Sequence, residues 1–509
     1  MHDSSRLALL SVAVPLFPRH LKPTRTSMGA FTVAAFLSTC CCYYSAAANV
    51  KPGQNLREAN VGVDDGRGGT DDHSPGRLTA ASALRQLAVV QVDQGAGQSS
   101  ATGGSLFAME KSRTYKGHRL SPLQSRSAFV TPSESAMCKQ WAVLTSIFDP
   151  TDTVRQLAAA DGWCVVVVGD KQGPAEYDVS GVIYLTPEDQ EELPYRIVPL
   201  LPWDHFGRKN IGYLYAVHHG AKVIYDVDDD NALIFPDAGV PHTASPYTPE
   251  TTTSFALGPE AFVHNPYGCF GGRGNVWPRG FPLDAVNDAD SSRCDLVSVE
   301  DALGKAGPKG RRLGVVQALA NHDPDVDAVY RLTHPPGGLP FDFEVDEEPL
   351  AEGMSPLKIV PPHAFTPYNS QATLHFPPAF WGMLLPVTVH GRVSDIWRSY
   401  FTQTLLPSTG AVAAFAPAWV KQVRNPHNYL ADFQAELPLY EQSGALVSFL
   451  RDHRSQSAAA RKAGVSLPER IDALMVEMYE YGILGEADVE LSQAWIEDLF
   501  SVGYNPRAE

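Results

Sequence analysis

The chain has 509 residues, of which 44% are hydrophobic and 19% are charged, and its formal net charge is −17. This apolar content is typical of a globular protein and excludes wholesale disorder. The net acidic charge argues against a general nucleic-acid binder, which needs a concentrated basic surface. The 41 glycines and 40 prolines predict many loops between the regular elements.

The N-terminal region carries a candidate membrane segment. Residues 28–48 form an uncharged, moderately apolar run that follows basic residues and precedes acidic ones. A run of about 20 residues is long enough to cross a bilayer, and the charge asymmetry places residues 1–27 in the cytosol. We therefore expect a single-pass signal anchor. Cleavage after Ala46-Ala47-Ala48 and a short signal core at Leu7–Phe17 remain alternatives.

The rest of the chain divides into three parts by composition. Residues 49–138 are rich in Gly, Ser, Asp, Gln and Ala with weak periodicity, which predicts a disordered stem beyond the membrane. Residues 139–450 alternate apolar runs with amphipathic segments and are predicted to form the globular domain. Residues 451–509 are predicted to form a helical C-terminal extension.

The start of the globular domain predicts an α/β fold. Continuous apolar runs at Trp141–Ile147, Trp163–Gly169 and Lys222–Asp226 are typical of strands buried on both faces. Phe206–His219 has the pattern of an amphipathic helix. Strand–helix–strand repeats of this kind predict a mostly parallel central sheet flanked by helices. Ligands of such sheets bind at the carboxyl ends of the strands.

An acidic cluster directly follows the third of these strands. Asp226, Asp228, Asp229 and Asp230 place four carboxylates within five positions. Such carboxylates repel one another unless solvated or neutralised, and a divalent cation is a natural neutraliser. A strand followed by Asp-x-Asp is how GT-A-type glycosyltransferases hold a nucleotide-sugar diphosphate with Mg²⁺ or Mn²⁺. A solvated acidic turn and a calcium loop remain alternatives.

A longer block around this cluster resembles a known family. PWDHFGRKNIGYLYAVHHGAKVIYDVDDD at 202–230 is similar to the corresponding block of the STELLO family of Golgi glycosyltransferases. The likeness covers roughly 140–430 and continues in chain order through six further motifs. These are NPY (265–267), VWPRGFPL (276–283), DPDVDAVYRLT (323–333), PYNSQ (367–371), AFWGMLLPVTV (379–389) and RVSDIWRSYF (392–401).

The resemblance implies a type II Golgi membrane protein with a GT-A-like lumenal domain. It implies a nucleotide-sugar donor, which we expect to be UDP-linked, a glycan acceptor, and Mn²⁺ or Mg²⁺ as cofactor. Asp226, Asp228 and Asp229 match the acidic motif of the family and are the predicted metal ligands, whereas Asp230 departs from that motif.

Two functional hypotheses follow from this resemblance. The first is a metal-dependent, inverting glycosyltransferase acting on a cell-wall or matrix polysaccharide. The second is a non-catalytic Golgi factor that assists cellulose or other polysaccharide synthase complexes, as plant members of the family are implicated in doing. Turnover of a donor sugar discriminates between them.

Five further polar residues are candidates for binding the donor. Asp170 ends the second predicted strand, where it could accept hydrogen bonds from the base or ribose. Arg208 and Lys209 precede the acidic strand and could contact the pyrophosphate, Arg as a bidentate donor and Lys as a point charge. Asn369 and Gln371 could bond sugar hydroxyls. A purely structural role is the alternative for each.

An inverting transferase also needs a base for the acceptor hydroxyl. Asp395 in RVSDIWRSY is the best candidate, and an ion pair with Arg392 or Arg398 is its alternative role. His427 is a candidate third metal ligand or phosphate contact.

The cysteines of the globular part would face an oxidising lumen. Cys164 lies within a buried strand and is predicted to be free. A Cys269–Cys294 bridge is possible, although spacing alone does not fix connectivity.

Overall fold

The computed structural model divides the chain into two units, Met1–Gln98 and Ser99–Glu509. All described residues belong to the second unit. The predicted membrane run at 28–48 lies outside them, and no helix in the described part is long and apolar enough to cross a bilayer. The described residues are 109–120, 129–241, 252–273, 275–303, 312–334, 338–345, 347, 356–424 and 428–505.

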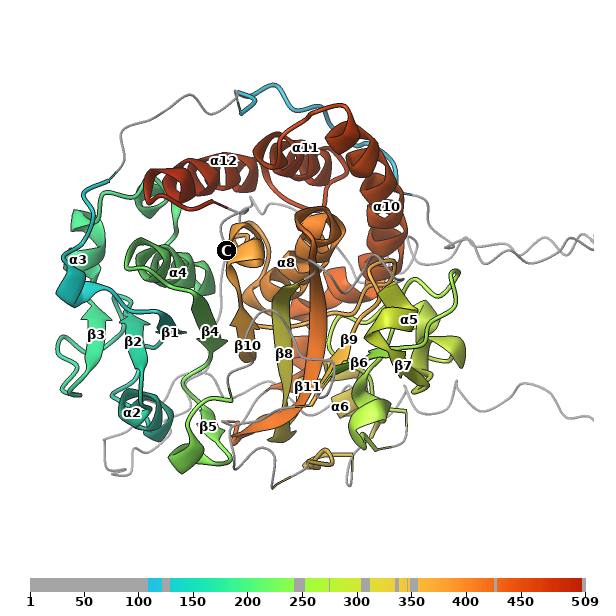
Figure 1. Cartoon of the computed structure of the whole chain (residues 1–509), viewed down its shortest axis with the longest axis horizontal. Coiled ribbons are helices and arrows are strands. Elements are labelled where there is room, and N and C mark those ends of the chain that lie inside the picture. Colours follow the sequence, from blue (N-terminus) through green and yellow to red (C-terminus); the bar gives the residue numbers. More distant parts are fainter. Residues whose placement is uncertain are drawn as a thin grey trace, which may run out of the picture. The chain divides into compact units, whose positions relative to one another are not determined.

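Eleven strands of the described residues form one sheet at the centre of this unit (Figure 1). Their order across the sheet is β3-β2-β1-β4-β10-β8-β11-β9-β6-β7, and β5 pairs with β11. The strands are β1 (Gln140–Thr145), β2 (Trp163–Val168), β3 (Val182–Leu185), β4 (Val223–Val227), β5 (Asn231–Leu233), β6 (Thr252–Phe255), β7 (Leu296–Ser298), β8 (Arg312–His322), β9 (Leu357–Ile359), β10 (Ala372–His375) and β11 (Ala411–Gln422).

The α/β class is confirmed, but the prediction of a mostly parallel sheet is wrong. β1, β2 and β4, the three strands expected from the sequence, run parallel, and β3 pairs parallel with β2. β10, however, is antiparallel to both of its neighbours, β4 and β8. Half of the ten described pairings are antiparallel. A short strand that is buried on both faces has a similar composition whether it pairs parallel or antiparallel, so the sequence of β10 does not reveal its direction.

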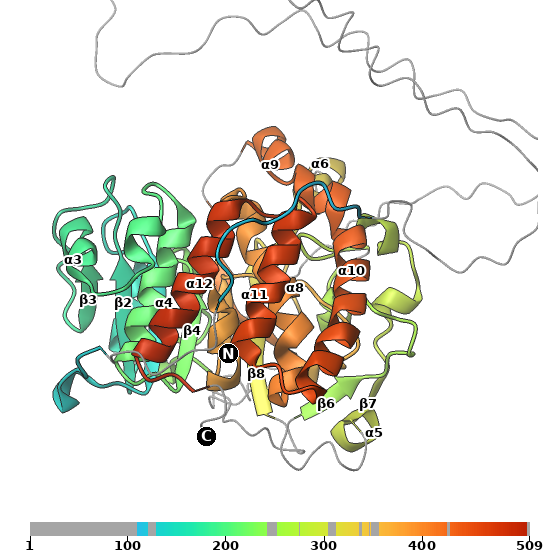
Figure 2. The same ribbon diagram turned by 90° about the horizontal axis from the view of Figure 1, so that it is seen from above.

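Helices cover both faces of the sheet. The face that packs α4, α8, α10, α11 and α12 holds the larger core, and α2 and α5 pack on the other (Figures 1 and 2). Alternate residues of β1 divide between these cores, with Val143 in the first and Ala142 and Leu144 in the second. The helices are α2 (Asp152–Ala159), α3 (Pro187–Glu192), α4 (Lys209–His218), α5 (Val299–Leu303), α6 (Ala328–Thr333), α8 (Gly391–Leu405), α9 (Tyr429–Ala435), α10 (Leu437–Lys462), α11 (Leu467–Glu480) and α12 (Glu486–Ser501).

The helix expected at Phe206–His219 begins with a short 3-10 turn, Phe206–Arg208, before α4. Gly220, which follows it, has φ +87°, a backbone conformation that favours glycine. This arrangement places Arg208 and Lys209 at the N-terminus of α4, close to the carboxyl ends of the strands.

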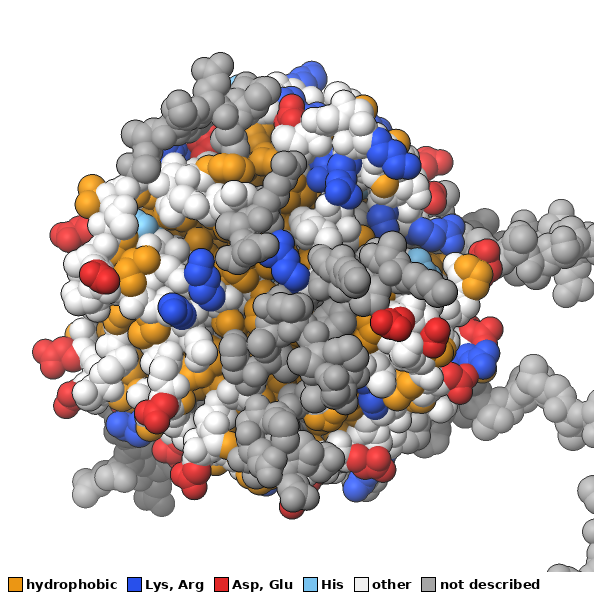
Figure 3. All heavy atoms as spheres, viewed as in Figure 1, with side chains coloured by type: hydrophobic (Ala, Val, Ile, Leu, Met, Phe, Trp, Pro, Cys, Tyr) orange, Lys and Arg blue, Asp and Glu red, His pale blue; other side chains and the backbone are white. Residues whose placement is uncertain are grey.

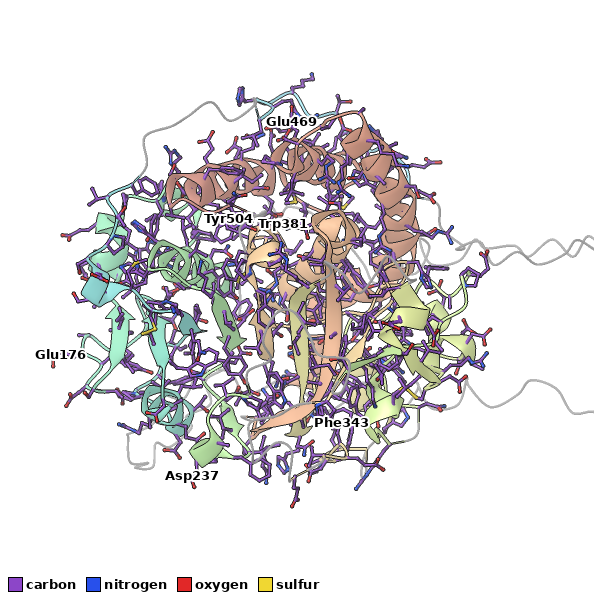
Figure 4. The ribbon with its side chains drawn as sticks, viewed as in Figure 1. Glu176, Asp237, Phe343, Trp381, Glu469 and Tyr504 are labelled. Atoms are coloured by element: carbon purple, nitrogen blue, oxygen red, sulfur yellow. A yellow bond between two sulfur atoms is a disulfide. The ribbon has the colours of Figure 1, made fainter. Side chains whose placement is uncertain are left out.

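The C-terminal helices form a layer of the domain. α10 begins at Leu437 and crosses the predicted boundary at 450. Trp495 Nε1 on α12 donates to the carbonyl of Trp381 at 2.9 Å, and Tyr504 Oη donates to Pro377 O at 2.6 Å (Figure 4). These contacts join the helices to the turn Pro377–Met383, so they are packed onto the α/β core.

The described part of the predicted stem also packs on this layer. Lys111 Nζ lies 2.6 Å from Glu480 Oε2 at the end of α11, and Arg119 Nε lies 2.7 Å from Asp472 Oδ2. Leu120 is 7% exposed. The structure therefore differs from the expected disordered stem over 109–120, which is extended but held in place.

Two disulfides are present in the described residues. Cys269–Cys294 is confirmed. The prediction that Cys164 is free is wrong, because it bonds Cys138. Cys164 lies near the start of β2 in register with Trp141 of β1, and the chain just before β1 brings Cys138 beside it, with the two Cα atoms 6.4 Å apart.

Candidate functional site

The carboxyl ends of β1, β2 and β4 open onto one cavity, which we call the strand-end cleft. It has a volume of ≈ 420 Å³, and its lining includes Ser146, Phe148, Asp170, Arg208 and Asp229. β1 lies between β2 and β4, so the strand order reverses beside it. Such a reversal in a parallel sheet leaves a crevice where ligands bind.

Asp170 shapes one wall of the strand-end cleft. Its Oδ1 accepts a hydrogen bond from the backbone of Lys171 at 2.7 Å, and its Oδ2 accepts one from Asp204 N at 2.9 Å. Asp204 has a φ of +54°, unusual for a residue other than glycine. Asp170 therefore holds this strained loop in place at the mouth of the cleft.

Arg208 lines the same cleft and has an unused donor. Its Nε donates to Gln190 Oε1 at 2.8 Å, its Nη1 donates to Leu201 O at 3.1 Å, and its guanidinium stacks 3.3 Å from the ring centre of Trp203. Nη2 is buried and has no hydrogen-bond partner in the described part of the chain. Burial lowers the pKa of Arg208 to about 10, which leaves it cationic at neutral pH. It is a fixed cation suited to an oxyanion.

Lys209, in contrast, does not line the strand-end cleft. Its side chain is fully buried, and its Nζ lies 2.7 Å from Asp226 Oδ1 and 3.1 Å from Asp228 Oδ1. It also donates to the carbonyls of Val227 at 2.8 Å and Ser370 at 3.2 Å. Burial alone would lower the pKa of Lys209, but the two carboxylates raise it above its ordinary value. The structure therefore places Lys209 as the partner of two carboxylates outside the cleft lining, and its pyrophosphate contact stays a prediction.

Asp226 is the partner of two buried cations. In addition to Lys209, Arg398 Nη1 lies 2.9 Å from its Oδ2. Burial would raise the pKa of Asp226, but the two cations hold it below its ordinary value. His375, 3.8 Å away, is neutral because burial and then Arg398 lower its pKa to about 3. Asp226 is 0% exposed and engaged by both cations, and its role as a metal ligand stays a prediction.

The next three carboxylates lie nearer the surface. Asp229 lines the strand-end cleft and accepts a hydrogen bond from Ser146 Oγ, and burial raises its pKa. The Asp228 side chain is 36% exposed and contacts Lys209 Nζ at 3.1 Å. Asp230 accepts a hydrogen bond at 3.0 Å from Gln422 Nε2 at the end of β11.

These positions decide which residues fit a metal ion. No group of three or more His, Cys, Asp or Glu side chains in the described residues is arranged to hold one. His427 lies outside those residues. Asp228 and Asp229 retain the hard oxygen donors that Mg²⁺ or Mn²⁺ prefers, and an ion held by two carboxylates completes its coordination with phosphate oxygens. Of the three predicted aspartate ligands, Asp228 and Asp229 are the two whose side chains lie nearer the surface.

Asp395 lies in a buried ion pair. It is 4% exposed, and its two oxygens accept hydrogen bonds from Arg279 Nη1 at 3.1 Å and Nη2 at 2.8 Å. The ion pair is thus with Arg279, and Arg392 instead pairs with Glu436. A buried carboxylate bound on both oxygens would have to give up this pair to meet an acceptor hydroxyl, so the structure shows a pairing role for Asp395 and its role as the base stays a prediction.

Asn369 and Gln371 also belong to this interior network. Asn369 Nδ2 donates to Asp325 Oδ2 at 2.8 Å, and Asp325 is itself paired with Arg279. Gln371 Nε2 donates to Gln422 Oε1. Both side chains are 6% exposed. The structure therefore gives them positioning roles behind the acidic cluster.

Several residues of the site were missed from the sequence. Ser146 follows β1, and the rule that places ligands at strand ends could have found it. Trp203, which stacks on Arg208, and Arg279, which joins Asp325 to Asp395, are brought to their partners only by the fold. No spacing in the sequence links them.

The fold and the site define a class. This is an α/β protein with a mixed sheet, in which a cleft at the carboxyl ends of parallel strands lies beside a cluster of carboxylates and is lined by a buried arginine, Arg208.

The comparisons with known proteins identify the family. Residues 392–507 match the family model described as STELLO glycosyltransferases. The chain is 34% identical over 387 residues to "Probable glycosyltransferase STELLO2" and 33% identical over 379 residues to "Probable glycosyltransferase STELLO1", both of Arabidopsis thaliana. These matches cover 75% and 74% of this chain. The chain belongs to the STELLO family.

The chain spans about half the length of these curated relatives, 47% of the first and 46% of the second.

Proposed function

We propose that the protein binds a nucleotide-sugar donor in the strand-end cleft and transfers its sugar to a glycan acceptor. One observation carries the proposal: a fully buried arginine, Arg208, lines a cleft at the carboxyl ends of parallel strands and has an unused Nη2. A diphosphate is the group in such a donor that a fixed guanidinium binds best. The names of the relatives support the same class of reaction.

The cleft offers a partner for each part of the donor. Phe148 is 52% exposed and presents apolar surface to a nucleobase, which we expect to be uracil. Arg208 holds the diphosphate and favours its departure, because negative charge grows on the leaving group. A GT-A-like arrangement would place Mg²⁺ or Mn²⁺ on Asp228 and Asp229, where the ion would neutralise that charge when bound.

The test is a screen of the full chain with UDP-sugars and glycan acceptors in Mn²⁺, scored by release of UDP and by labelled product. The wild type is expected to turn over one donor. Asp229→Asn is expected to lose activity by tenfold or more, since it removes charge from the cleft. Asp237→Asn is the matched control, an exposed carboxylate near the sheet edge and outside the cleft (Figure 4). Equal activity of the two variants would refute the assignment of the cleft.

The buried pairing of Asp395 favours a second candidate function. With the predicted base bound to Arg279, the domain could hold the donor without transferring it, as a Golgi factor that assists a polysaccharide synthase. Donor binding without turnover of any UDP-sugar, together with loss of synthase delivery in cells carrying Asp229→Asn, would favour this second function.

We further propose that this domain faces the Golgi lumen behind a type II anchor at 28–48. Two disulfides support export, because such bonds are rare in the reducing cytosol. Protease added to sealed microsomes is expected to spare the domain. Digestion of the domain in intact vesicles would contradict this topology.

A further inference from the structure

A second cavity lies at the amino end of β11. Its volume is ≈ 590 Å³, and its lining includes Ser408, the α10–α11 loop and two arginines, Arg461 and Arg470. β11 has 12 residues and ends at Gln422, which contacts the acidic cluster. At about 3.3 Å per residue its two ends are up to roughly 40 Å apart. This cavity, which we call the arginine cavity, is separate from the strand-end cleft.

Arg470 is the buried member of the pair. It is 5% exposed, and its Nη1 donates to the hydroxyls of Ser408 at 2.9 Å and Ser457 at 3.2 Å. Its Nε is buried and has no hydrogen-bond partner in the described residues. No carboxylate in that part of the chain pairs with it. Burying a guanidinium without a counter-charge is unfavourable unless a ligand supplies one.

Arg461 adds a second uncompensated charge. It lies in the last turn of α10, is exposed, and forms no ion pair with a carboxylate of the described residues. Burial and then the charge of Arg461 lower the pKa of Arg470, so the two cations oppose each other. Basic side chains gather over the α10 side of the face in Figure 3.

The first turn of α11 adds positive potential to the arginine cavity. α11 starts at this cavity with Ser466 as its N-cap, so the positive end of its dipole lies at the cavity that the two arginines line. Its acidic residue, Glu469 (labelled in Figure 4), is bound by Ser466 N at 2.9 Å and Ser466 Oγ at 2.6 Å, and it does not line the cavity. The cavity therefore has positive charge that the described residues leave unbalanced.

We propose that the arginine cavity is a binding site for a phosphate group. Two arginines that line one cavity offer several N–H donors, which suits the three or four oxygens of a phosphate. The volume admits a phosphate ester larger than the ion itself. The phosphate comes either from a soluble compound or from a lipid headgroup, and both sources share this chemistry.

The test compares the full chain with Arg461→Gln, Arg470→Gln and Lys462→Gln. Lys462 neighbours Arg461 at the end of α10 but does not line the cavity, so Lys462→Gln is the matched control for loss of one charge. Binding of inorganic phosphate is measured by titration calorimetry at constant ionic strength, and cosedimentation is measured with vesicles of phosphatidylcholine with and without phosphatidic acid. Wild type and Lys462→Gln are expected to bind alike, and Arg461→Gln about tenfold more weakly.

The two probes distinguish the source of the phosphate. Calorimetric binding that weakens in Arg461→Gln supports a soluble phosphate compound. Cosedimentation that needs phosphatidic acid and falls in Arg461→Gln, without binding of the free ion, supports a lipid headgroup. Equal responses of wild type and Arg461→Gln to both probes, or no response of the wild type to either, would overturn the proposal. Arg461 is exposed, so its variant remains informative if Arg470→Gln fails to fold.

Discussion

Replacing Asp226 by Asn separates the role found in the structure from the role suggested by the acidic motif. Asp226 is completely buried between Lys209 Nζ at 2.7 Å and Arg398 Nη1 at 2.9 Å, and the nearby His375 is neutral. The substitution keeps the shape of the side chain and removes its charge. Lys209 then keeps one carboxylate partner, Asp228, and Arg398 keeps only the weaker influence of Asp395.

The expected loss of stability is that of breaking a buried ion pair, about 3–5 kcal/mol. For a unit of roughly 400 residues, with an unfolding entropy of ~2.1 cal/mol/K per residue, this is a fall in Tm of roughly 4–6 °C. The assay is thermal unfolding of wild type, Asp226→Asn and the exposed control Asp237→Asn, each with and without UDP and Mn²⁺. The control is expected to stay within about 0.5 kcal/mol of wild type.

An unchanged Tm of Asp226→Asn, with loss of ligand-dependent stabilisation, would establish Asp226 as a metal ligand. If Asp226→Asn kept the wild-type Tm and lost only the stabilisation by UDP and Mn²⁺, its carboxylate would be a ligand and the reasoning from burial would be refuted.

Three other outcomes follow from the described contacts. Asp395→Asn is expected to lower stability by about 3 kcal/mol with donor affinity intact, because it breaks the buried pair with Arg279; unchanged unfolding with abolished transfer would instead make it the base. Burial lowers the pKa of His264 to about 4, whereas its value in the unfolded chain is near 6.5. The unfolded chain therefore binds the proton first as the pH falls from about 6.5 to about 4, and the folding stability decreases by up to roughly 3 kcal/mol over this range. His264→Phe should show a shallower acid limb in pH-dependent unfolding, and an identical limb would contradict this. The double variant Cys138→Ser, Cys164→Ser opens a loop of sequence separation 26 and is expected to lose about 3 kcal/mol in denaturant titration, whereas no loss would show that the bond does not stabilise the fold.

The parts of the fold that local patterns encode were predictable from the sequence. β1, β2 and β4 are apolar runs of the right length, and Thr151 accepts a hydrogen bond from Val154 N as the N-cap of α2. The direction of β10 was not predictable, because reversal depends on how the preceding chain returns to the sheet. The partner of Cys164 was not predictable either, because Cys138 comes beside it only when β1 pairs with β2.

The candidate site also combines residues that local patterns predict with contacts that only the fold determines. Asp229 and Arg208 line the cleft, and their placement there was predictable because strand ends and basic residues at the start of a helix are visible in the sequence. The sequence could not show which charged residues neutralise one another in the interior. Lys209 differs from its neighbour Arg208 by one position, yet α4 turns it inward to Asp226 while Arg208 lines the cleft. Asp395 lies between two arginines in the sequence and pairs with a third, Arg279.

The central claim is that the strand-end cleft binds a nucleotide diphosphate through Arg208. Titration calorimetry of UDP into the full chain in Mn²⁺ tests it directly, with Arg208→Lys and Asp237→Asn compared with wild type. Lys keeps the charge but loses the forked donors and the stacking on Trp203, so Arg208→Lys is expected to bind UDP about tenfold or more weakly while Asp237→Asn binds normally. Wild-type affinity in a folded Arg208→Lys protein, or no binding of UDP to the wild type, would contradict the claim.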